Sequence, residues 1–434
     1  MRTRSLRATA AIGLCAGLLF PSAVQSQHRH DTPVSPAAAD TLTSSPTTPR
    51  RPARDSTRVA DSILGVCRPH ARHSLDAYSS CIGSGLAALS SAGNIALALG
   101  TLDRLIQRES SLARVSHPLA HTLGYAVQST PKTASLLLAQ CDDRYQSGCY
   151  HGILQRYFAA RMGTPLSPKV LVAPCDPFRG GSEHSRLFAC LHGIGHGLMM
   201  YHRYDARAAL PDCDRLAAEW DRSSCYGGVF MEHNMGARMQ AFGEGGLGMH
   251  SHSTPTKTVT LFKPGDLHYP CNATPERYQR ECYSLQADII LPALKHDYAR
   301  AARVCDGAGS QALVRACYRG LGRNASAAGG FEAQRIQGLC ASGSRAGAPF
   351  CYEGAVRQLA YAVSELPRGL SFCARLAEGE ARKRCWGGLG MQIGGFFLDA
   401  ASRQAACQSP RPGDVRACLN GAGAGGDART NDEQ

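Results

Sequence analysis

Five histidines with helical spacing are the residues best suited to chemistry in this sequence. His192 and His196 lie four residues apart in FACLHGIGHGLMMYH, and His117 and His121 repeat this spacing in VSHPLAHTLG. Residues i and i+4 share one face of a helix, with Cβ atoms about 5–6 Å apart, so each pair can offer two imidazoles to one cation. His151, in CYHGIL, is the fifth candidate. Neutral imidazoles bind zinc, copper and iron, and the pattern therefore predicts a transition-metal site.

The cysteines indicate the repeat that must position these histidines. The second cysteine of most pairs opens a motif such as CYRGLG or CWGGLG, and the second cysteines at 282, 317, 351, 385 and 418 are 35, 34, 34 and 33 residues apart. A period near 34 residues holds two short helices and two turns. The sequence therefore predicts an all-α fold, an α-solenoid of about ten helical-hairpin repeats over residues 57–420, with an insertion loop at 243–270.

One predicted repeat lacks both cysteines but keeps the pattern. VSHPLAHTLG aligns without a gap on CLHGIGHGLM, so that His117 and His121 are equivalent to His192 and His196. His151 occupies the position of His117 in the repeat between them. Because equivalent positions of stacked repeats lie side by side, we expect all five imidazoles to converge on one surface.

The next repeat adds GVFMEHN, with Glu232 and His233. Glu232 is a candidate metal ligand or general base, and His233 a candidate ligand. They lie seven and eight residues after the repeat's second cysteine, whereas the histidine pairs lie two and six residues after it. These positions do not share one helix face, so either the helix starts differently here or one of the two side chains points elsewhere. On the glycine-rich insertion, His250 and His252 are candidates for a lid.

The cysteine spacing also predicts disulfides within repeats, each joining the end of a first helix to a second helix. Eighteen cysteines follow Cys15, and an even, regular set in an exported chain indicates disulfides. Pairing within a repeat is the simplest of many connectivities, and the alternative fold is a disulfide-rich globule whose spacing only appears regular. The predicted bonds are Cys67–Cys81, Cys141–Cys149, Cys175–Cys190, Cys213–Cys225, Cys271–Cys282, Cys305–Cys317, Cys340–Cys351, Cys373–Cys385 and Cys407–Cys418.

The two ends of the chain read as export and linker segments. Residues 1–26 have the charged start, short apolar run and small residues of a signal peptide, 27–56 read as a disordered linker, and 421–434 as a disordered tail. We therefore expect an exported protein, periplasmic or secreted, without stable membrane insertion. The net charge of +13 is spread along the chain without a basic block, which argues against nucleic-acid binding.

Together these features predict an exported metal-binding protein, most simply a metalloenzyme that activates water or dioxygen. A histidine-rich, thiol-free site in an oxidising compartment favours copper or iron over zinc, and an oxidoreductase over a hydrolase. The sequence has no HExxH, GxSxG or CxxCH motif. The alternatives are a metal storage or delivery protein, and a non-catalytic solenoid that binds a protein, peptide or small molecule on its concave face.

Overall fold

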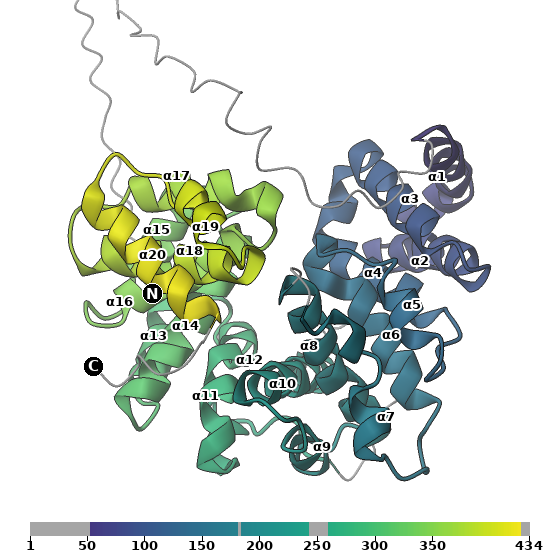
Figure 1. Cartoon of the computed structure of the whole chain (residues 1–434), viewed down its shortest axis with the longest axis horizontal. Coiled ribbons are helices and arrows are strands. Elements are labelled where there is room, and N and C mark those ends of the chain that lie inside the picture. The colour runs from purple at the N-terminus through teal and green to yellow at the C-terminus, as the bar shows by residue number, and fades with distance from the viewer. Residues whose placement is uncertain (1–52, 181–183, 243–258, 427–434) are drawn as a thin grey trace, which may run out of the picture. The chain divides into compact units, whose positions relative to one another are not determined.

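Pairs of helices, in most of which the second helix is the longer, make up most of the described chain (Figure 1). The computed structural model describes residues 53–180, 184–242 and 259–426, and these ranges contain helices and no strand. The first helices are α1 (Ala53–Cys67), α3 (Ile95–Arg108), α5 (Ala134–Leu138), α7 (Pro168–Val172), α9 (Ala206–Cys213), α13 (Tyr298–Asp306), α15 (Ala333–Ala341), α17 (Leu366–Ala374) and α19 (Ala400–Ala406).

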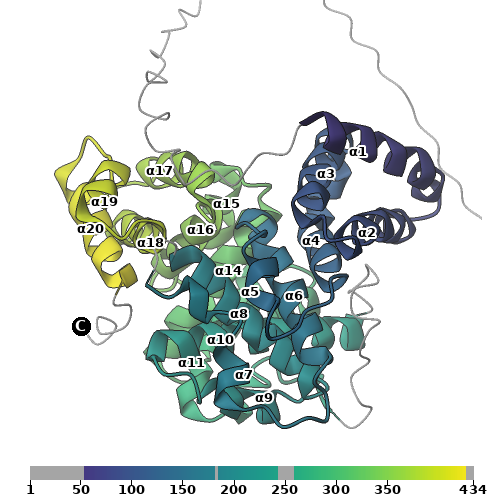
Figure 2. The same ribbon diagram turned by 45° about the vertical axis from the view of Figure 1, so that its right-hand side comes forward.

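The second helices form a continuous row, in which each packs against the second helix of the next repeat (Figure 2). They are α2 (Leu75–Ser91), α4 (Ser116–Tyr125), α6 (Gly148–Ala159), α8 (His184–Tyr201), α10 (Glu219–Phe242), α11 (Glu276–Leu285) with α12 (Ala287–Ala293), α14 (Gln311–Ala328), α16 (Ala348–Leu359), α18 (Glu380–Phe396) and α20 (Pro412–Gly426). The all-helical class and the helical repeats are thereby confirmed. The continuous α-solenoid stays a prediction.

Glycines at the contacts let these second helices approach closely. A Cβ on Gly152 would lie 2.1 Å from the carbonyl oxygen of His121, and a Cβ on Gly228 would lie 1.9 Å from that of His192. Backbone atoms cannot yield as a flexible side chain can, so any larger residue here forces the helices apart. The recurring glycine three residues after the second cysteine therefore sets the distance between neighbouring repeats.

Several second helices end in the same left-handed turn. The N–H of Tyr204, at φ 68°, donates to the carbonyl of Met199 at 2.7 Å, and the N–H of Phe331, at φ 62°, donates to that of Ser326 at 2.9 Å. These bonds satisfy carbonyl groups that the helix end leaves without an intrahelical partner. In α8 the turn also places Tyr204 beside the next helix, which matters for the site described below.

Nine disulfides tie a second helix to its own first helix or to the short segment before the second helix, in the pairs that the cysteine spacing predicts. Their Cα–Cα distances lie between 5.4 and 5.7 Å. The enclosed segments are short, from 8 to 15 residues in sequence separation. Each bond therefore fixes one hairpin rather than joining distant repeats. Nine such bonds are consistent with an oxidising extracellular environment.

Removing one of these bonds is expected to weaken its own repeat. Replacing both Cys340 and Cys351 by alanine opens a loop of 11 residues in separation, which should lower the free energy of unfolding by about 3 kcal/mol. Urea unfolding followed by circular dichroism measures the change. An unchanged midpoint and slope would mean that the bond does not restrain the unfolded chain.

The predicted segment boundaries are only partly covered by the described residues. The signal peptide 1–26 lies outside them. Helix α1 begins at Ala53, inside the segment 27–56, and α20 continues to Gly426, inside 421–434. The boundaries at 56 and 421 therefore cut into helices, because the polar, small residues there are helical within the repeat.

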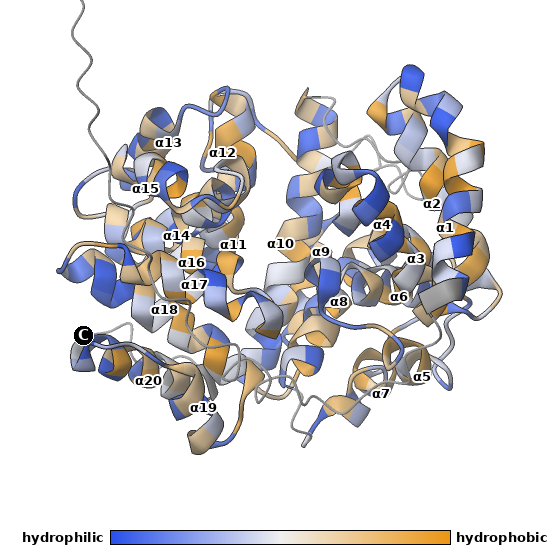
Figure 3. Cartoon of the chain, turned by 90° about the horizontal axis from the view of Figure 1, so that it is seen from above, coloured by the Kyte–Doolittle hydropathy of each residue, from blue (hydrophilic) through white to orange (hydrophobic). Residues whose placement is uncertain are grey.

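Buried apolar side chains form the core between the helices. Hydrophobic and hydrophilic residues alternate along the same helices (Figure 3). The described end of the insertion is anchored in this way. Leu261 is buried with Ala237 of α10 and Ile289 of α12, and Val259 and Phe262 pack against them. Within the described ranges, no helix has the length and hydropathy needed to cross a membrane.

Candidate metal centre

Three consecutive second helices bring the five histidines together. His117 and His121 lie on α4, His151 on α6, and His192 and His196 on α8. Ring centroids of neighbouring histidines are 4.4 to 5.6 Å apart. All are buried except His117, which is partly buried. The glycine contacts between these helices make such convergence possible.

The five rings form two triads that share one member. One triad is His117, His121 and His151, the other is His151, His192 and His196, and within each the candidate ligand atoms lie within 4.8 Å of one another. Such spacing allows three nitrogen atoms to reach one cation. Each triad could therefore hold a metal ion, and His151 is common to both.

Hydrogen bonds decide which nitrogen of each ring carries the proton. The amide nitrogen of Gln155 lies 3.0 Å from Oε2 of Glu232, so the Gln155 Oε1 atom faces Nδ1 of His121, at 3.2 Å. His121 therefore donates through Nδ1–H, which leaves its Nε2 as an acceptor. The Nδ1 atom of His151 lies 3.2 Å from that acceptor and donates to it. His151 is thereby left with a lone pair on Nε2.

The other two members of the second triad are oriented in the same manner. Nδ1 of His196 donates to Oε2 of Glu232 at 2.8 Å, and a ring N–H of His192 donates to the carbonyl of Ser224. The Nε2 atoms of His151 and His196 are buried and have no hydrogen-bond partner among the residues that the structure describes. Buried polar atoms are nearly always paired. Two such lone pairs in one triad fit a cation that is bound between them.

Glu232 connects the polar groups that lie behind the second triad. Its carboxylate accepts hydrogen bonds from His196 and Gln155, and also from the hydroxyl of Tyr204 at 3.0 Å. Burial raises the pKa of the Tyr204 hydroxyl, and the charge of Glu232 raises it further, so this hydroxyl stays protonated and donates. A carboxylate behind a histidine fixes the ring orientation and makes the opposite nitrogen a stronger ligand.

A strained loop supports His117 in the first triad. Its Nδ1 donates to the carbonyl of Tyr145 at 2.6 Å. Tyr145, Gln146 and Ser147 all have positive φ, between 52° and 59°. Left-handed backbone at a residue other than glycine costs on the order of 1–3 kcal/mol, so the surrounding contacts must hold the loop in place.

The surroundings keep at least two of the imidazoles neutral. Burial lowers the pKa of His151 well below its usual range, and the neighbouring His196 lowers it further. Burial also lowers the pKa of His192, again with a smaller contribution from His196 and one from the guanidinium of Arg323. A neutral imidazole retains the lone pair with which it binds a metal.

The remaining predicted residues that the structure describes belong to neither triad. Glu232 belongs to neither triad, because it approaches His196 from the side opposite the ligand atom. His233 is buried next to Asn234, with its Nδ1 3.4 Å from the Asn234 Oδ1 atom, and it too is outside both triads. Burial lowers the pKa of His233 to about 4. The candidate lid residues His250 and His252 lie outside the described residues.

Three supporting groups were not predicted from the sequence. Gln155 lies six residues after Cys149, the position that His196 occupies in its own repeat, and aligning the repeats could have identified it. Tyr204 and the carbonyl of Tyr145 carry no such signal, because turns after and before the second helices bring them to the site.

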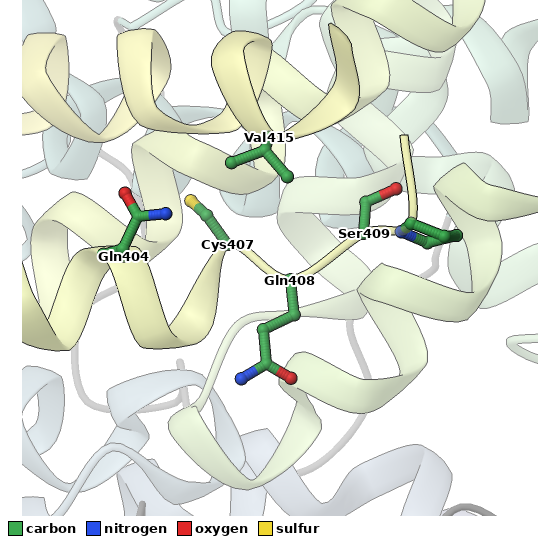
Figure 4. A pocket seen from close by; sticks show the side chains of 6 residues that line it. Gln404, Cys407, Gln408, Ser409 and Val415 are labelled. Carbon is green, nitrogen blue, oxygen red and sulfur yellow. The ribbon is translucent and has the colours of Figure 1, made fainter. Parts of the chain in front are cut away.

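One surface hollow lies apart from this cluster, in the last repeat (Figure 4). It has a volume of about 460 Å³, is open to solvent, and is lined by uncharged residues that include Gln404, Gln408 and Val415. Cys407 also lines it, and its sulfur is bonded to Cys418. The hollow therefore offers neither a metal ligand nor an acid or base.

Comparison with protein-family models, curated proteins and solved structures finds no match for this chain. The fold and the site define its class: an all-helical, disulfide-rich protein with buried histidine triads that could hold a metal ion.

Proposed function

We propose that this is an exported metal-binding protein whose principal ion is held by His151, His192 and His196. The observation that carries the proposal is the pair of buried Nε2 atoms, on His151 and His196, that lack any partner within the described ranges. Each ring of this triad donates one ring N–H to a fixed acceptor. Three oriented imidazoles are the ligand set of an open, catalytic type of site.

The first triad has a supporting role in this proposal. A metal that used His121 Nε2 would have to displace the hydrogen bond from His151, which is 3.2 Å long. Among the described residues, no hydrogen bond occupies the Nε2 atoms of His151 and His196 in the second triad. His121 therefore positions His151. Together with His117, it also offers a secondary position for an ion.

The proposed protein is a metalloenzyme. Three histidines leave a position where a bound metal would activate water or dioxygen. The absence of thiolate from the ligand set, with all described cysteines in disulfides, favours copper or iron and redox chemistry, and zinc with hydrolysis is the runner-up. In this scheme Glu232 is a positioning residue that orients His196. The repeats form an α-solenoid whose second helices carry the site.

The shared His151 favours a second candidate, metal storage or delivery. Two triads with one common histidine allow an ion to pass from one to the other. Chelator competition distinguishes the candidates, because a delivery protein exchanges its ion within seconds to minutes and turns over no substrate. A catalytic ion stays bound through purification.

Elemental analysis of the natively purified chain tests the proposal. We expect about one equivalent of a transition metal per chain. Less than about 0.2 equivalents of any such metal, with no uptake from added copper, iron or zinc, would contradict it.

Changing Glu232 to glutamine tests the orienting carboxylate. The amide keeps the shape but loses the charge that holds the His196 N–H, so metal affinity should fall about 10- to 100-fold with the helices intact. Chelator competition measures the affinity. Asp414→Asn, which alters a buried carboxylate paired with Arg382 in the last repeat, should leave it unchanged. Equal affinities in both variants would show that Glu232 does not act on the metal.

A further inference from the structure

The face that carries the histidines continues into the later repeats with charged side chains. Counted from the second cysteine of its repeat, position two holds His151 and His192 in the metal-binding repeats. In the repeats of α14 and α16, position two holds Arg319 and Glu353. Position six is charged in three of the later repeats, at Asp288, Arg323 and Arg357, and apolar in the last two, at Met391 and Ala424. Along these equivalent positions, the imidazoles of the metal-binding repeats are thus followed by three arginines and two carboxylates.

Two of these arginines are paired with the two carboxylates. Arg319 Nε lies 2.8 Å from Oε1 of Glu353, and an Arg323 nitrogen lies 2.6 Å from Oδ2 of Asp288. The side chains of the first pair are mostly buried, at 11% and 3% exposed. Pairing of this kind holds Arg319 and Arg323 in place and cancels their charges.

Arg357 is the third arginine, and neither of the two carboxylates pairs with it. Its guanidinium makes no hydrogen bond or ion pair with any residue in the described part of the chain. The side chain is open to solvent, and yet burial is the largest cause that lowers its pKa, ahead of the opposing effect of Glu353. Arg357 is therefore surrounded by protein and still reachable from water, as a binding residue must be.

Contacts around this arginine group place it near the helices that carry the histidines. One turn beyond Arg357, the hydroxyl of Tyr361 lies 3.4 Å from the hydroxyl of Ser147. The residue after Ser147, Gly148, packs directly against His117. Helices α8 and α18 are also in contact.

We propose that Arg357, framed by Arg319 and Arg323, binds the oxyanion of a small-molecule substrate whose other end reaches the metal. This inference rests on the proposed metal site. Guanidinium groups bind carboxylate and phosphate through paired, charge-assisted hydrogen bonds. The substrate is accordingly a small molecule that carries one of these two groups.

A structural role for Arg357 is the competing explanation. The Oε2 atom of Glu353 is buried and has no hydrogen-bond partner among the described residues, and Arg357 lies one helical turn away. If Arg357 served only to balance Glu353, its loss would lower stability without affecting any anion.

Anion binding to the full chain, loaded with Cu²⁺, distinguishes these roles. Inorganic phosphate and acetate are titrated separately, by calorimetry and by the visible absorption of the copper. We expect one of the two to bind and to shift the copper spectrum, and the one that binds identifies the oxyanion. Arg357→Gln should weaken that binding about 10- to 100-fold with the copper content unchanged. Arg335→Gln, on the exposed face of α15, is the matched control and should bind as the wild type does.

The outcomes separate the two proposals. Absence of copper binding in the wild type contradicts the proposed function. Copper binding without any effect of phosphate or acetate overturns the arginine site alone. Equal anion affinity in the wild type and in Arg357→Gln also overturns the arginine site. If that variant is in addition less stable to heat, the role of Arg357 is to balance the charge of Glu353.

Discussion

Replacing His151 by glutamine is expected to abolish metal binding at both triads. His151 is the one residue that they share, and its Nε2 is one of the two buried histidine nitrogens without a partner in the described ranges. Loss of a ligand should cost more than loss of a supporting group, so the affinity should fall by more than about 100-fold. Chelator competition and elemental analysis measure the effect, with circular dichroism to show that the helices persist.

Two matched variants make this prediction specific. His202→Gln changes a histidine directly after α8, where its Nε2 contacts Asp212 at 2.8 Å, and should keep the full metal content. His121→Gln should reduce affinity by only about 10- to 100-fold, because His121 positions His151 from behind. If His121→Gln were the more damaging change, the ion would belong to the first triad. Full metal content in His151→Gln would refute both sites.

Replacing Gly195 by alanine is expected to lower stability and to disturb the metal site. The new Cβ would lie 2.1 Å from the carbonyl oxygen of Cys225 and 2.6 Å from the backbone nitrogen of Val229. Both are backbone atoms of α10, so α8 and α10 must move apart. Overpacking of this kind costs about 1–3 kcal/mol or more, and separation of these helices also breaks the 2.8 Å contact between His196 and Glu232.

Urea unfolding and metal content of the Gly195→Ala variant check this prediction. Gly338→Ala is the control, since Gly338 lies in helix α15, is exposed, and has nothing within 4 Å of its added Cβ. That change should be neutral or stabilise by up to about 1 kcal/mol, as alanine favours helix. If Gly195→Ala behaved like Gly338→Ala, close contact between second helices would not be what holds the histidines together.

The repeat explains why much of the site was predictable. Equivalent positions of neighbouring repeats lie side by side, so the alignment of His117 and His121 with His192 and His196 was enough to bring five rings together. The disulfide partners followed from the same period. The convergence of the histidines and the pairing of the cysteines both follow from spacing along the chain and from helix register. Both can therefore be predicted from the sequence alone.

The supporting groups depend on features that the period does not contain. Glu232 does not share the helix face of the histidine pairs, because it contacts His196 from the side opposite the ligand atom. His233, its neighbour, points away, so the expectation of a sixth histidine ligand stays without support from the geometry. Tyr204 and the Tyr145 carbonyl reach the site from left-handed turns. Which ring nitrogen is free follows only from these hydrogen bonds.

Anomalous diffraction from crystals of the natively purified protein tests the central claim most directly. At the absorption edge of the bound metal, we predict a peak about 2.1 Å from the Nε2 atoms of His151 and His196 and next to the ring of His192. No peak among the five histidines, or a peak held by other residues, would contradict the account.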